Sequence, residues 1–175
     1  PVTSKTGDPI RLDRPLELDD VPTPALLIDL EAFERNLEKM AGFAAGKGID
    51  LRPHTKTHKS PYIAKRQIER GAVGVCTAKV SEAEVMIDAG VKAVLVTSPI
   101  VSAEKIERFV ALAKRSDELR IVVDNQSSAE KLDQAGRETG TELGVLVDLD
   151  QCLLPQRIAQ VLEQRVTGIV GLQSG

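Results

Sequence analysis

The feature that most constrains the fold is a regular alternation of short apolar runs with segments of helix length. Six runs are expected to be strands, and they cover residues 49–54, 72–76, 91–96, 119–123, 143–149 and 167–172. A shorter apolar run at 25–28 is expected to form a short strand before them. Two strands joined through a helix that crosses over between them lie parallel in one sheet. The alternation therefore predicts an α/β fold with a parallel sheet and right-handed crossovers.

Capping residues set the expected helix boundaries. Asp29 is expected to cap a helix with one apolar face, and Gly46 and Gly48 are expected to end it. Ser60 followed by Pro61 has the pattern of an N-cap with proline in the first turn. Further helix starts are expected at Ser102 and at two capping boxes, Ser81 with Glu84 and Ser127 with Glu130.

Two architectures accept this order of elements, an open doubly wound sheet and a (β/α)8 TIM-type barrel. No G-x-G-x-x-G turn follows any strand, which weighs against a dinucleotide-binding sheet. Polar residues follow each strand instead, and a barrel gathers such residues at one mouth: Lys56, Thr77, Thr97, Asp124, Asp148 and Gln173. The barrel is therefore the favoured fold, and this chain holds only about six of its eight βα units.

The segment 51–59, Leu-Arg-Pro-His-Thr-Lys-Thr-His-Lys, contains both histidines of the chain. If the strand continues through it, Arg52, His54, Lys56 and His58 lie on one face, because alternate side chains of a strand share a face. Such a basic cluster suits an anion and a nucleophilic lysine. A solvated basic loop explains the same composition, and spacing alone leaves both readings open.

Composition excludes some classes of function. The net charge is -3 with both signs spread along the chain, so there is no basic stripe for nucleic acid. No apolar run approaches the roughly 20 residues of a membrane span. Residues 1–20 are charged and rich in proline, which predicts an extended arm and not a signal peptide, and so a cytoplasmic protein.

Cys76 and Cys152 are too isolated for a disulfide framework or a metal pair, and we expect buried thiols.

Several stretches of the chain resemble one enzyme family. They are Thr23-Pro24 with Leu26, Asp29 and Asn36; the segment 52–59; the segment 74–83; and Gly171-Leu172-Gln173. These stretches resemble the D-threonine aldolase and D-serine dehydratase branch of the fold-type III pyridoxal-phosphate enzymes, whose first domain is an alanine racemase-like barrel. The resemblance covers nearly everything from Val21 onward, so residues 21–175 are expected to form part of that barrel.

The resemblance implies that Lys56 is the Schiff-base lysine for pyridoxal 5'-phosphate. Strand parity agrees, since Lys59 falls on the opposite face. Lys59 is expected at the start of the next helix, as a surface charge or a charge on the phosphate side, and Lys79 is expected to be a solvated charge at a helix start. The remaining expected site residues are His54 and His58 in catalysis and Arg52, Thr77 and Gln173 at the cofactor. For the histidines, proton transfer competes with a structural role in orienting the loop. For Arg52, an ion pair with a carboxylate such as Asp148 competes with cofactor binding.

The activity implied by the resemblance is cleavage of a D-3-hydroxy amino acid, such as D-threonine, into glycine and an aldehyde. The family implies a homodimer and a divalent metal (Mn, Mg or Zn) whose ligands lie in a C-terminal β-domain, so no metal ligand is expected here. The alternatives are D-serine or D-threonine dehydration, a non-catalytic pyridoxal-phosphate carrier, and a remnant with a structural role. Because six strands cannot close a barrel, we expect this sequence to be part of a longer functional polypeptide.

Overall fold

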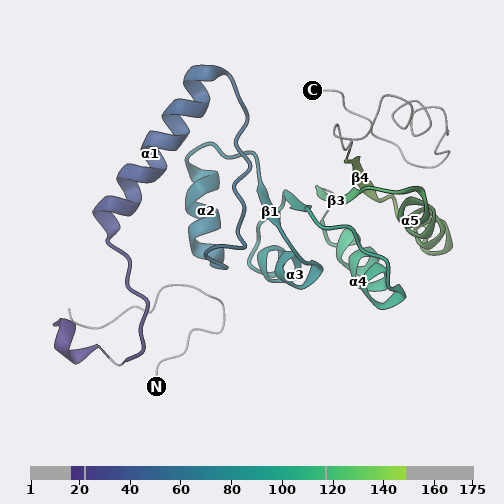
Figure 1. Cartoon of the computed structure of the whole chain (residues 1–175), viewed down its shortest axis with the longest axis horizontal. Coiled ribbons are helices and arrows are strands. Elements are labelled where there is room, and N and C mark those ends of the chain that lie inside the picture. The colour runs from purple at the N-terminus through teal and green to yellow at the C-terminus, as the bar shows by residue number, and fades with distance from the viewer. Residues whose placement is uncertain (1–16, 22, 117, 149–175) are drawn as a thin grey trace.

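The computed structural model describes residues 17–21, 23–116 and 118–148. From residue 61 onward, helices and strands alternate along the described chain (Figure 1). The elements are a 3-10 helix η1 (Leu18–Asp20), α1 (Leu30–Lys47), α2 (Pro61–Glu69), β1 (Val75–Thr77), α3 (Val80–Asp88), β2 (Val94–Val96), α4 (Ala103–Ala113), β3 (Leu119–Val123), α5 (Gln126–Thr139) and β4 (Gly144–Val147). The expectations for Cys152, for Gln173 and for a strand at 167–172 lie outside the described residues.

The described strands form one sheet in the order β1-β2-β3-β4, and every neighbouring pair is parallel. Each strand lies beside the next in sequence, with a helix between them on the same side of the sheet (Figure 1). This is the arrangement of an arc of a (β/α) barrel. The prediction of an α/β fold with parallel strands is confirmed, and the arc is a partial barrel.

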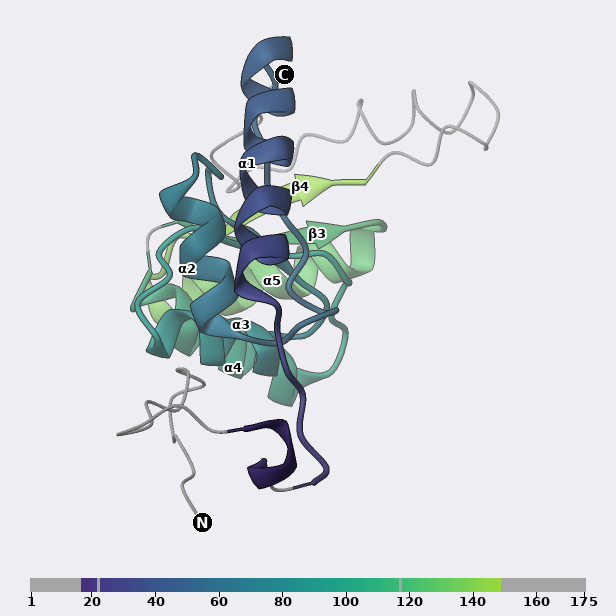
Figure 2. The same cartoon turned by 90° about the vertical axis from the view of Figure 1, so that its left-hand side faces the viewer.

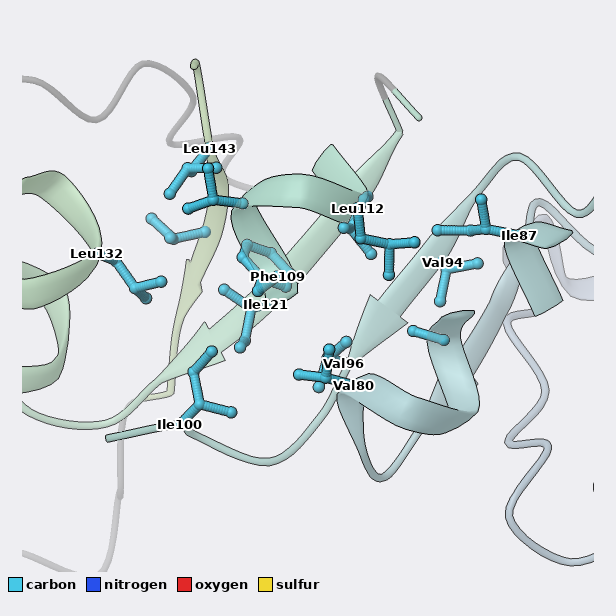
Figure 3. Close-up of a cluster of buried hydrophobic side chains, with 14 of the residues drawn as sticks. Val80, Ile87, Val94, Val96, Ile100, Phe109, Leu112, Ile121, Leu132 and Leu143 are labelled. Atoms are coloured by element: carbon cyan, nitrogen blue, oxygen red, sulfur yellow. The ribbon is translucent and has the colours of Figure 1, made fainter. Parts of the chain in front are cut away.

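The hydrophobic core lies between this sheet and its helices. Alternate residues of each strand face the helix layer, and Val75, Val94 and Ile121 there are fully buried. Phe109 of α4 and Leu132 of α5 fill the space between the sheet and these helices (Figure 3). The remaining strand residues face the opposite side, which is the inner face of the arc, and they are half-buried or exposed: Cys76, Leu95, Arg120, Val122, Gly144 and Leu146.

Two of the expected strands are not formed as predicted. The run at 25–28 forms no strand, because no hydrogen-bonded ladder joins it to the sheet described above, and Leu26 within it is 92% exposed. Of the run at 49–54, only His54 takes part in a bridge, to Cys76. Pro53 still accepts a hydrogen bond from the Cys76 N–H at 2.8 Å, but it has no N–H of its own to extend the ladder.

Several expected helix caps are confirmed. The Asp29 side chain accepts from Ala32 N at 2.9 Å, and the Ser60 hydroxyl accepts from Ile63 N at 3.4 Å. Gly48 ends α1 in the left-handed conformation that favours glycine (φ 63°), whereas Gly46 lies inside the helix.

Both expected capping boxes are wrong. Ser81 lies inside α3, which Lys79 precedes, and Ser127 lies inside α5. Asn125 caps α5 instead, because its side chain accepts from Ser128 N at 2.9 Å. Ser102 stands at the N-cap of α4, as expected, but makes no side-chain capping bond there.

Helix α1 lies at the edge of the molecule, and its C-terminal half extends beyond the helix layer (Figures 1 and 2). Only Ala44 of this helix is buried. Its ties to α2 are ionic: Glu34 bonds to Arg66 Nη2 at 2.6 Å and also to Arg70, and Glu38 bonds to Arg70 at 2.9 Å. The hydrogen bond and charge of Arg66 lower the pKa of Glu34, with a further contribution from Arg70.

No helix among the described residues is both long and apolar enough to cross a membrane.

Candidate functional site

The candidate site begins with a tight turn that follows the bridge between His54 and Cys76. Thr55 is buried, and both its N–H (2.8 Å) and its hydroxyl (3.1 Å) donate to the Cys76 carbonyl. Lys59 N–H then closes the turn on the Thr55 carbonyl at 2.7 Å. The prediction that Lys56 and His58 share a strand face with His54 is therefore wrong, because the chain turns at residues 55–58.

The His54 ring is held at both nitrogens. Its Nε2 lies 3.2 Å from the Thr97 hydroxyl, and its Nδ1 accepts a hydrogen bond from the Lys56 backbone N–H at 3.2 Å. Burial lowers the pKa of His54, the Lys56 charge lowers it further, and the Glu82 carboxylate opposes both. The lowered pKa favours the neutral form of the ring, and its Nδ1 holds the Lys56 backbone N–H.

The two lysines of the turn have different surroundings. The Lys56 side chain is exposed at the edge of the sheet where the parallel strands end. Its amine has no ion-pair partner within the part of the chain that the structure describes. Lys59 has a positive φ of 50°, and its amine lies 3.9 Å from Glu82 at the start of α3. Glu82 also accepts a hydrogen bond from Ala78 N at 2.9 Å, so Lys59 is tied to α3 while Lys56 is not.

His58 faces the start of α2 and not the inner face of the arc. Its Nδ1 accepts a hydrogen bond from the Ser60 N–H at 3.0 Å, directly at the cap of that helix. Burial lowers the pKa of the half-buried His58 ring. This placement agrees with the structural role that the sequence left open.

The inner face of the arc carries two arginines, each beside a glycine. A Cβ at Gly74 would overlap the guanidinium of Arg52 and would lie 2.6 Å from the Ala93 carbonyl oxygen. A Cβ at Gly144 would lie 2.9 Å from Cγ of Arg120. Both glycines therefore leave room for a long basic side chain. Arg120 was missed from the sequence, although a charged residue inside the apolar strand Leu-Arg-Ile-Val-Val is a signal for an inward-facing position.

The other residues expected at the mouth lie at or just after the ends of their strands. Thr77 is fully buried, and its side chain lies on the helix side, the side of Val75, whereas its carbonyl accepts from Thr97. Asp124 and Asp148 lie together at the C-terminal edge, where Asp148 N donates to Val123 O at 2.8 Å. Arg52 and Asp148 form no ion pair.

Cys76 lies on the inner face next to the turn. Burial raises the pKa of its thiol, and the nearby Arg52 charge opposes that rise. Among the residues that the structure describes, no group of three or more His, Cys, Asp or Glu side chains could hold a metal ion.

Comparison with known proteins identifies the family of this arc. A family model, "Alanine racemase, N-terminal domain", matches residues 28–154. The 3-hydroxy-D-aspartate aldolase of Paracoccus denitrificans is 40% identical over 136 residues, which are 77% of this chain and 35% of that enzyme. The D-threo-3-hydroxyaspartate dehydratase of Delftia sp. (strain HT23) is 33% identical over 128 residues, which are 73% of this chain and 33% of that enzyme.

A solved structure shows the same arrangement. The crystal structure of D-threonine aldolase from Filomicrobium marinum matches with a TM-score of 0.73 and 48% identity, over 76% of this chain and 36% of that chain. This chain spans about a third of the length of the curated relatives it matches. It belongs to the alanine racemase N-terminal domain family, among the fold-type III pyridoxal-phosphate proteins that include D-threonine aldolase, 3-hydroxy-D-aspartate aldolase and D-serine dehydratase.

Proposed function

We propose that Lys56 is the lysine that binds pyridoxal 5'-phosphate, and that the chain supplies part of the active site of a lyase. The proposed reaction is retro-aldol cleavage of D-threonine-like D-3-hydroxy amino acids to glycine and an aldehyde. The observation that carries the proposal is the exposed, unpaired amine of Lys56 at the C-terminal edge of parallel strands, where barrel enzymes place their chemistry.

The residues around Lys56 fit this cofactor. The donor set on the inner face is cationic, with the guanidinium groups of Arg52 and Arg120, and the cofactor and an amino acid substrate both carry negative charge. Gly74 and Gly144 lack the Cβ that would collide with these two arginines, so both arginine side chains can lie along the inner face. When bound, the cofactor supplies an electron sink for the bond that breaks at the substrate α-carbon.

The proposed roles of this chain's residues follow from their contacts. Lys56 supplies the amine, and His54 holds the Lys56 backbone through Nδ1. Since both nitrogens of His54 are engaged, we assign it to positioning and not to proton transfer. His58 stabilises the end of the turn through Ser60, and Arg52 attracts an anionic group of the cofactor or substrate.

The remaining parts of the proposal concern groups that the described residues do not supply. The divalent metal (Mn, Mg or Zn) implied by the family would polarise the substrate hydroxyl, and its ligands would come from outside these residues. Gln173 stays a predicted cofactor contact. Cofactor binding by the Thr77 side chain also stays a prediction. Because that side chain lies on the helix side of the sheet, we favour a contribution to the site through the Thr77 carbonyl, which accepts from the Thr97 hydroxyl. A homodimer also stays a prediction.

The second candidate is a dehydratase, and the Delftia relative supports it because that protein is a D-threo-3-hydroxyaspartate dehydratase. The two reactions share the cofactor lysine and differ in the bond that breaks at the substrate. Glycine and an aldehyde from D-threonine indicate the aldolase, whereas ammonia and a keto acid indicate the dehydratase. Binding of the cofactor without either product would indicate a carrier protein.

The test of the cofactor lysine compares Lys56→Ala with Lys59→Ala in the complete protein. Lys59 is a matched control because it lies in the same turn but is tied to Glu82. We expect Lys56→Ala to abolish the visible absorbance of the lysine-bound cofactor, and we expect Lys59→Ala to retain it. The opposite result would show that Lys59 and not Lys56 binds the cofactor.

A further inference from the structure

We propose that Thr97 is a positioning residue that acts through His54 on the backbone of Lys56, a role that rests on the proposed function of Lys56. Thr97 directly follows β2. Its hydroxyl lies 3.2 Å from His54 Nε2 and 3.1 Å from the Thr77 carbonyl oxygen, and His54 Nδ1 lies 3.2 Å from the Lys56 amide nitrogen. These contacts form one continuous series of hydrogen bonds, the hydrogen-bonded line, which connects the end of β1, the end of β2 and the turn.

The direction of every hydrogen bond in this line is fixed from both ends. At one end, the Thr77 carbonyl can only accept, so the single proton of the Thr97 hydroxyl points to Thr77. The Thr97 oxygen is then an acceptor for His54 Nε2–H.

At the other end, the Lys56 amide can only donate, so His54 Nδ1 must carry a lone pair. In a neutral imidazole the proton then lies on Nε2, which is the tautomer that Thr97 requires. The two ends agree, and the Thr97 hydroxyl selects the only neutral form of His54 that can hold the Lys56 amide.

Thr97 is itself well placed to act as a fixed reference. Its backbone N–H donates to the same Thr77 carbonyl at 2.8 Å, which continues the parallel ladder between β1 and β2. The hydroxyl is therefore held by the sheet, and the exposed lysine turn is held by the hydroxyl through the ring. A side chain of the same shape without the hydroxyl would keep the ladder and lose only the link to His54.

The experiment uses the complete protein with Thr97→Val, which removes the hydroxyl, and Thr97→Ser, which restores it. Ser98→Ala, at the exposed neighbouring position, is the control. Nitrogen NMR of the histidine ring, assigned through His54→Gln, reports the tautomer in the absence of cofactor. Titration with pyridoxal 5'-phosphate, followed by absorbance, gives the cofactor dissociation constant.

We expect wild-type His54 to carry its proton on Nε2, and we expect Thr97→Val to give a mixture of tautomers. We also expect Thr97→Val to weaken cofactor binding about five-fold, the effect of one hydrogen bond. Thr97→Ser and Ser98→Ala should behave as wild type.

Three results would overturn the proposal: a wild-type ring protonated on Nδ1, a Thr97→Val variant with unchanged tautomer and affinity, or an equal loss in Thr97→Ser. The first of these needs no variant, so a failure of Thr97→Val to fold leaves the test intact. If the tautomer responds as expected but Lys56→Ala keeps the cofactor band, then the hydrogen-bonded line stands and the assignment of Lys56 fails.

Discussion

Gly74 is the position where a single methyl group should do most damage to the inner face of the arc. Its φ of 155° is one that other residues rarely adopt, and a Cβ would lie 2.6 Å from the oxygen and 2.7 Å from the Cβ of Ala93. The Ala93 oxygen cannot move freely, because it accepts the Val75 N–H at 2.9 Å beside β1. Gly74→Ala therefore combines backbone strain with overpacking of a hydrogen-bonded strand.

The magnitude follows from adding these two effects. Backbone strain at a positive φ costs about 1–3 kcal/mol, and overpacking costs about 1–3 kcal/mol more. We therefore expect Gly74→Ala to lower the free energy of unfolding by roughly 2–6 kcal/mol. Gly71 isolates the first effect, since its φ is 98° and nothing lies within 4 Å of a Cβ there. Gly42 in α1 has neither problem, so Gly42→Ala should stabilise by about 0.5–1 kcal/mol.

Urea unfolding of the three variants beside the wild type measures these differences. The order of stability should be Gly42→Ala first, then wild type, then Gly71→Ala, and last Gly74→Ala. A Gly74→Ala protein no less stable than Gly71→Ala would show that Arg52 and Ala93 do not approach Gly74 as described, and the inner face would need a different arrangement.

Three further predictions concern the helices and the histidine at α2. Asn125→Ala should cost about 1 kcal/mol of unfolding free energy through loss of the α5 cap, whereas Ser127→Ala should change it by less than about 0.5 kcal/mol; a larger effect at Ser127 would restore the capping box. Phe109→Ala should cost about 3–5 kcal/mol because the ring is fully buried. Phe43→Ala, at a side chain 59% exposed, is its control, and similar losses at both positions would contradict the placement of the core. The lowered pKa of His58 means that the unfolded chain binds its proton first, so the stability contribution is present above the ordinary histidine pKa and is lost as the pH falls through the folded value. Unfolding free energies measured between about pH 7 and 5 should therefore fall less steeply for His58→Gln than for the wild type, and equal slopes would refute the burial of this ring.

The sequence was sufficient for the order and direction of the strands, because the alternation of apolar runs and capped helices permits few other topologies. It was insufficient for local choices between similar signals. A serine three residues before a glutamate predicts a capping box, but at Ser81 and Ser127 the same pattern falls inside a helix. The side chain that caps α5 belongs to Asn125, two residues earlier. An apolar run such as 25–28 becomes a strand only where a neighbour supplies hydrogen bonds, and sequence does not show the neighbour.

The candidate site was predictable in its composition and not in its geometry. Lys56 lies at the strand ends, as the polar residues that follow each strand predict, but the predicted strand face shared by Lys56 and His58 with His54 is wrong because the chain turns after His54. The remaining geometry of the site depends on contacts between residues far apart in the chain. The bond between His54 and Thr97 joins positions 43 residues apart, and no local pattern announces it.

The ionic attachment of α1 has a consequence for how the protein responds to salt. Docked by Glu34 and Glu38 with one buried residue, this helix lacks the apolar contact area that makes other helices insensitive to ionic strength. Added salt screens exposed charge pairs and leaves the core between the sheet and α3, α4 and α5 unaffected. Helix α1 should therefore behave as a separate cooperative unit, whose amide protons exchange with solvent at a rate set by the ionic strength, while those of the strands do not.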